Sequence, residues 1–181
     1  MVAAIAAVAV AGFLVWFLAF RDGGTETVSG STEVTGPAEV RGPDGTPFTL
    51  SLPSGWKALS QEGLSELPGS PVAVMQQTEG SGVLIINTQP PSSATVSAVG
   101  KQVENKLRHS VSDFKLVGAG PFNLEAGQAF QVSYARTEAG TANTLVVVAA
   151  GGRIYTLNSV VPGGDEDAVK QAIAMIESFN A

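Results

Sequence analysis

From residue 48 onward, apolar and polar residues alternate in short runs, and most runs end near a glycine or a proline. The first run, FTLSL at 48–52, alternates strictly, which is the period-two pattern of a strand with one buried face. Pro53 and Gly55 then predict a turn, because proline fixes φ and glycine supplies conformational freedom. Further runs with strand character are 71–77, 82–89, 114–124, 128–136, 144–150 and 153–161. A chain with so many half-buried strands is constrained to a fold built around a sheet.

Two stretches have the spacing of amphipathic helices instead. Between residues 94 and 110, valine and leucine recur every three or four positions while charged residues face away. Ser92 and Ser93 precede this stretch and are expected to cap it. The second stretch, 165–181, has one apolar stripe and starts with acidic residues, which a helix N-terminus favours. The order of three strands, a helix, four strands and a helix predicts an α+β domain, with a mainly antiparallel sheet of about six or seven strands flanked by helices.

The N-terminal residues are of a different kind. Residues 2–20 contain no charged side chain, and as a helix they would span roughly 29 Å, close to the ~30 Å hydrocarbon core of a bilayer. A cleaved signal peptide is the alternative, but the run is long for one and Phe20-Arg21-Asp22 is a poor cleavage site. We therefore expect one transmembrane helix, an uncleaved anchor over residues 1–21 that contacts the membrane through residues 2–20.

The orientation of this anchor rests on few charges. Arg21 is the basic residue next to the span, and the positive-inside rule alone would place it in the cytoplasm, but Asp22 neutralises it at once. Met1 is followed directly by the apolar run, so we expect that a short basic segment precedes it in the full gene product or was trimmed. With such a segment, the protein is a single-pass cell-membrane protein whose following domain is extracytoplasmic.

Residues 22–46 have the composition of a linker. Glycine, serine, threonine, proline and glutamate dominate, and such a segment cannot bury enough apolar surface to offset its ordering entropy. We expect a flexible tether here, with a root-mean-square reach of roughly 25 Å. The folded domain is then expected over residues 47–181.

The order of these elements resembles the PsbP-like family. The residues that carry the resemblance are the L-P-x-G-W motif after the first strand and the I-x-S-F ending: Leu52, Pro53, Gly55, Trp56, Ile176, Ser178 and Phe179. This family includes a lumenal subunit of the photosynthetic oxygen-evolving complex, a nuclear-import factor and many exported bacterial proteins. The resemblance covers residues 47–181 and implies a binding or assembly module, and it supplies no catalytic residue to carry over.

Composition and motifs argue against several functional classes. A net charge of −6 gives no basic face for nucleic acid, so none is expected as a partner. The chain has no cysteine, which excludes disulfides, thiolate metal sites and a cysteine nucleophile. His109 is the single histidine and lies at the predicted end of a helix, where a solvated capping residue is favoured over a catalytic base. We therefore expect no enzymatic activity, no catalytic residue and no cofactor.

Trp56 and the acidic cluster are the remaining candidates for a site. Trp56 is expected to fold back over the strand that it follows and to close one end of the core, and ligand stacking is the alternative. Asp165 and Asp167 are weak candidates for a metal site, because they lack the spacing of a known calcium loop. The preference of a helix N-terminus for acidic residues accounts for their position. We expect a membrane-tethered extracytoplasmic binding or assembly module that acts on a protein or an envelope lipid. The alternative is a carrier of a small apolar ligand or a metal, in a pocket near Trp56.

Overall fold

The fold is that of a computed structural model, which describes residues 37–65 and 67–181. The predicted membrane span and residues 22–36 of the predicted linker lie outside this part of the chain. Within the described ranges, no helix is both long enough and apolar enough to cross a bilayer.

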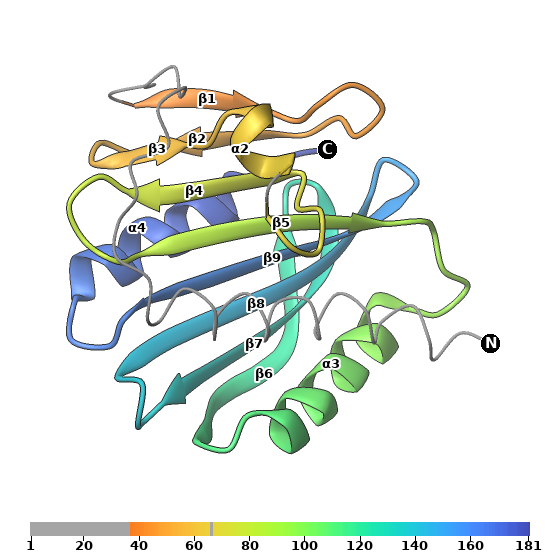
Figure 1. The fold of residues 1–181 in the computed structure, drawn as a ribbon. Coiled ribbons are helices and arrows are strands. Elements are labelled where there is room, and N and C mark those ends of the chain that lie inside the picture. The colour runs from red at the N-terminus through yellow and green to blue at the C-terminus, as the bar shows by residue number, and fades with distance from the viewer. Residues whose placement is uncertain (1–36, 66) are drawn as a thin grey trace.

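A seven-stranded antiparallel sheet forms the centre of the domain (Figure 1). Its strand order is β3-β4-β5-β9-β8-β7-β6, and a separate two-stranded sheet is formed by β1 and β2. The predicted α+β fold with a mainly antiparallel sheet is confirmed. The strands are β1 (Ala38–Arg41), β2 (Thr49–Leu52), β3 (Trp56–Ala58), β4 (Ala73–Gln77), β5 (Val83–Gln89), β6 (Phe114–Leu124), β7 (Gly127–Arg136), β8 (Thr141–Ala150) and β9 (Arg153–Pro162).

The start of the domain differs from the sequence prediction. Residues 38–41 were expected within a flexible linker, but they form β1, which pairs with β2 and places Val40 opposite Leu50. Val40 packs against the buried core, and this contact supplies the apolar burial that the composition of the segment hides. The run at 48–52 also does not join the main sheet. That edge is taken by β3, where Trp56 lies opposite Gln77 of β4.

Three helices are described: α2 (Gln61–Ser65), α3 (Val96–Ser110) and α4 (Glu166–Glu177). The N-cap of α3 is Thr95 rather than the expected Ser92 or Ser93, because the Thr95 side chain accepts a hydrogen bond from the Ala98 amide at 3.2 Å. The predicted hairpin at Gly151-Gly152 is present, and both glycines have positive φ, 55° and 73°, as a tight turn between β8 and β9 requires.

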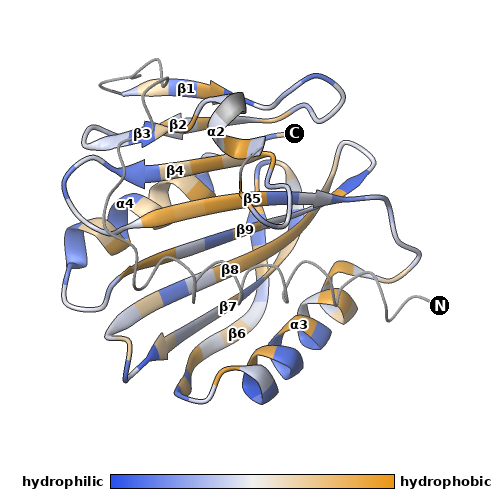
Figure 2. Ribbon diagram, viewed as in Figure 1, coloured by the Kyte–Doolittle hydropathy of each residue, from blue (hydrophilic) through white to orange (hydrophobic). Residues whose placement is uncertain are grey.

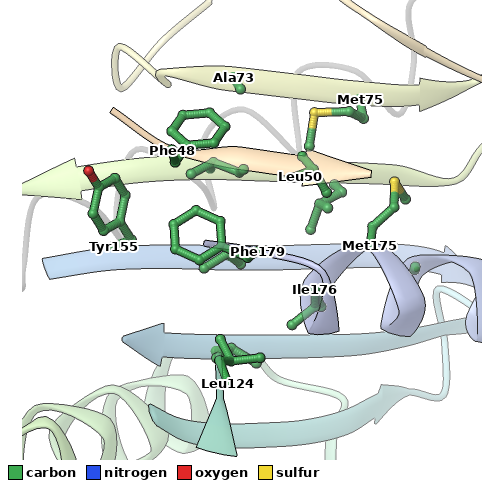
Figure 3. Packing of buried hydrophobic residues seen from close by; sticks show 14 of the residues in the cluster. Phe48, Leu50, Ala73, Met75, Leu124, Tyr155, Met175, Ile176 and Phe179 are labelled. Carbon is green, nitrogen blue, oxygen red and sulfur yellow. The ribbon is translucent and has the colours of Figure 1, made fainter. Parts of the chain in front are cut away.

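The first face of the main sheet is closed by α4 and the β1–β2 sheet. One continuous apolar cluster lies between them, and Figure 3 shows its aromatic part, where Phe48 and Phe179 stack at 5.6 Å and Tyr155 meets Phe179 edge-on at 5.2 Å. The Tyr155 hydroxyl donates to the Pro47 carbonyl at 2.9 Å, so the one polar atom of this group is satisfied. This face is a single, fully covered core.

The second face carries two separate apolar clusters. At one end α3 packs on β6, β7 and β8, and Gly100 lets the helix approach so closely that a Cβ there would lie 2.3 Å from the Phe130 ring. At the other end Leu64 of α2 covers Val74, Val83, Ile85 and Val160. Figure 2 shows that α3 turns its hydrophilic residues away from the sheet. Between the two clusters runs β9.

A buried ion pair fixes the corner where α3 leads into β6. The Asp113 carboxylate is 1% exposed and accepts from Arg136 Nε at 2.8 Å and from the amides of Glu138 and Ala139 at 3.1 and 3.3 Å. Burial alone would raise the pKa of Asp113, but the hydrogen bonds from Arg136 and Ala139 and the charge of Arg136 outweigh it, and the pKa is lowered. The pair thereby ties the β7–β8 turn to the end of α3.

Candidate functional site

The Trp56 side chain lies in the core. It is 1% exposed, and its Nε1 donates to Gln171 Oε1 of α4 at 2.7 Å, so both its apolar surface and its polar atom are satisfied within the domain. A ligand could stack on this ring only if α4 moved away. The geometry therefore gives Trp56 the role of joining β3 to α4.

His109 lies at the exposed end of α3. Its Nδ1 is 2.6 Å from the carbonyl oxygen of Asn105, one helical turn earlier. A ring N–H that donates to a carbonyl of the last turn is a helix-terminus interaction. Ser110 and Ser112 are exposed, and no hydrogen bond between either hydroxyl and His109 is formed in the described part of the chain.

The two acidic candidates have partners within their own helix. Asp165 is the N-cap of α4, and its Oδ1 accepts from the Ala168 amide at 2.9 Å. Asp167 Oδ1 lies 3.7 Å from Lys170 Nζ. Across residues 37–65 and 67–181, no group of three or more acidic or histidine side chains is placed to hold a metal ion.

The structure does bring together polar side chains on the second face, along β9. We call Asn87, Thr156 and Asn158 the polar seam. Asn158 lies directly opposite Ile85 of β5 and Leu145 of β8, and Thr156 lies opposite Asn87. Directly opposed residues share a face of the sheet, so the seam separates the cluster under α2 from the cluster under α3.

Asn158 differs from the other buried asparagine of this face. Asn143 on β8 is 4% exposed, and its Nδ2 donates to the Thr141 hydroxyl at 3.0 Å and to the Thr141 carbonyl at 3.3 Å. Asn158 is also 4% exposed, but its Oδ1 has no hydrogen-bond partner, and among the described residues it is the one buried side-chain nitrogen or oxygen atom in this state. A buried acceptor without a donor costs about 1–3 kcal/mol. A buried acceptor of this kind is normally satisfied by a water molecule or by a bound partner.

The residues of the seam offer hydrogen bonding and apolar contact. Its three residues and the neighbours Ile85 and Leu145 carry no charge and no nucleophile activated by a base. Asn158 Oδ1 is an unused acceptor, but it is buried together with Ile85 and Leu145, so a partner reaches it only if neighbouring side chains move aside. After such a movement, a bound group with an N–H or O–H donor and an apolar flank would satisfy this acceptor.

Sequence reasoning did not identify Asn158. The signal was present in RIYTLNSVV, where the amide of Asn158 occurs in a strand that is buried on both faces. Polar residues also occur in many satisfied positions, as Asn143 shows, and only the register of β5, β9 and β8 reveals which amide lacks a partner.

Comparisons with known proteins define the fold. The sequence matches no protein-family model. Nor does it match any curated protein sequence closely enough to establish a relationship. Among solved structures, the cyanobacterial PsbP protein CyanoP of Synechocystis sp. PCC 6803 is similar with a TM-score of 0.55 and 16% identity, over 89% of this chain and 99% of that chain. LpqN of Mycobacterium tuberculosis, described as involved in cell envelope biogenesis, is similar with a TM-score of 0.55 and 16% identity, over 79% of this chain and 90% of that chain. The protein therefore has the PsbP-like fold that its L-P-x-G-W and I-x-S-F motifs predict.

Proposed function

We propose that this protein is a membrane-tethered extracytoplasmic binding or assembly module, without catalytic activity, that holds a protein or a component of the cell envelope. The observation that carries the proposal is the polar seam, where Asn158 keeps a buried acceptor unsatisfied between two apolar clusters. A partner that moves aside the side chains around Asn158 and donates to its Oδ1 would remove that cost.

Two further observations support this reading. The PsbP-like fold is shared with LpqN, whose description places it in cell envelope biogenesis. The apolar run at residues 2–20 has the length of a membrane span and would hold the domain close to a membrane. A tethered module needs only modest intrinsic affinity, because the tether raises the effective concentration of partners at the same surface.

Photo-crosslinking in intact cells tests the site. A photoreactive phenylalanine analogue is placed at Thr156 in the seam or, as a control, at exposed Ser97 on α3. We expect an ultraviolet-dependent adduct of defined mass from Thr156 and none from Ser97, and we expect Asn158→Leu to reduce the adduct several-fold. Equal adducts from both positions, or no effect of Asn158→Leu, would contradict the proposed site.

A reporter fusion tests the location. Alkaline phosphatase, which is active outside the cytoplasm, is fused after Ala181, and a reporter that is active only in the cytoplasm is fused at the same place. We expect activity from alkaline phosphatase alone. Activity from the cytoplasmic reporter alone would show that the domain faces inward.

A further inference from the structure

Strand β6 forms one edge of the main sheet and is its longest strand. It pairs with β7 on one side, and no strand of the described chain pairs with its other side. The opposite edge of the sheet is the three-residue β3, which offers little to a partner. An edge strand carries a row of unpaired amide and carbonyl groups that can bind another strand.

The middle of β6 is exposed and contains two glycines. Residues 117–119 are exposed, and Val117 is 73% exposed, the highest value for a large hydrophobic residue in the described chain. Gly118 and Gly120 have open space where a Cβ would lie. Another strand can therefore approach this edge without meeting a bulky side chain at either glycine.

The hydrogen-bonding groups on this edge follow from the alternation of an antiparallel ladder. The two-residue turn at 125–126 directs the polar groups of Leu124 toward β7, so the groups of Ala119, Pro121 and Asn123 point outward. Pro121 has no N–H, and an outward position is where an edge strand tolerates proline. Ala119 and Asn123 keep an outward donor, and all three residues keep an outward carbonyl.

We propose that this edge pairs with the same edge of a second copy, antiparallel and centred on Gly120. In this register Gly118 of one copy lies opposite Phe122 of the other, so each aromatic ring covers an open glycine. Lys115 and Glu125 are both exposed and lie five residues before and five residues after Gly120. The register shift between Leu116 and Gly118 puts Lys115 on the face of Phe122, so each lysine reaches the end of the strand that carries the other copy's glutamate without lying directly opposite it.

Features of the strand also set the strength of this pairing. Pro121 removes one donor from each copy, and a register shift between Leu116 and Gly118 bends the strand near its start. The pairing is therefore short and reversible. These features disfavour long ladders with unrelated strands, while the two-fold register keeps the complementary ends together.

A single cysteine tests the register directly, because the chain has no cysteine of its own. Gly120 does not have a positive φ, and a Cβ there meets no atom within 4 Å, so Gly120→Cys fits the strand. In membranes that contain the full chain, mild oxidation should link most of Gly120→Cys into a disulfide dimer of twice the mass. The control Asn123→Cys lies on the same edge, but its two thiols would be about 20 Å apart in this register, and it should stay monomeric.

The charged ends provide a second test. Lys115→Glu or Glu125→Lys, each combined with Gly120→Cys, should lower the dimer yield at least two-fold, and the combination of both changes should restore it. Equal linking at residues 120 and 123, linking to a different protein, or no linking at residue 120 would overturn the proposal. A dimer yield that is unchanged by the single charge reversals would also overturn this register.

Discussion

The two faces of the sheet are built from similar residues but differ in how they are completed. On the first face, α4 and the β1–β2 sheet cover one continuous cluster, and the polar atoms of Trp56 and Tyr155 have partners. On the second face, α2 and α3 cover separate clusters, and Asn158 between them has an acceptor without a donor. The difference indicates that the first face stabilises the domain, whereas the second face keeps a feature that stability alone does not explain.

The largest expected change in stability comes from a substitution in the core of the first face. Trp56→Ala removes a buried indole and its hydrogen bond to Gln171, and we expect a loss of about 3–5 kcal/mol in the free energy of unfolding. Denaturation of residues 37–181, followed by circular dichroism, measures this loss. The unaltered truncated chain should unfold cooperatively with blue-shifted emission from Trp56, its one tryptophan. Red emission from the folded chain would show that Trp56 is exposed.

The next effect concerns the Asp113–Arg136 pair at the corner of the second face. The pKa of Asp113 is lowered in the folded domain, so folding favours the ionised carboxylate. The stability that the pair contributes is therefore present above the unfolded pKa of about 3.9 and is lost as pH falls through the folded pKa. Asp113→Asn should cost about 3 kcal/mol at neutral pH. It should also make stability less dependent on pH in the acid range, and an unchanged acid profile would contradict the role of this pair.

A smaller effect is expected in alkali. Burial raises the pKa of Tyr134 to about 12. The charge of Arg136 opposes this rise, and the charge of Asp113 adds to it. The folded domain keeps this tyrosine protonated while the unfolded chain ionises from about pH 10, so stability is lost between about pH 10 and 12, on the order of 2 kcal/mol. Tyr134→Phe should reduce this loss. Tyr155, whose pKa is also raised by burial, should account for part of the remainder.

Most of the main sheet could be predicted from the sequence, and the candidate site could not. Alternation predicted β5 and β6–β9 and the glycine pair predicted their last hairpin, because these patterns are local. β1 was missed because its pairing with β2 and the burial of Val40 are tertiary contacts within a polar composition. Asn158 was missed for a related reason: whether an amide in a strand finds a donor depends on two neighbouring strands, not on its own segment.

The most direct test compares the two buried asparagines of the second face. Asn143→Leu and Asn158→Leu make the same change at positions with the same exposure, on adjacent strands. Asn143→Leu removes hydrogen bonds to Thr141 and should lower the free energy of unfolding by about 1–2 kcal/mol. Asn158→Leu removes an unsatisfied acceptor and should raise it by about 1 kcal/mol. If the free energy of unfolding falls in Asn143→Leu and rises in Asn158→Leu, the result supports the claim that the second face keeps Asn158 for a partner. A lower free energy of unfolding in both variants would contradict that claim.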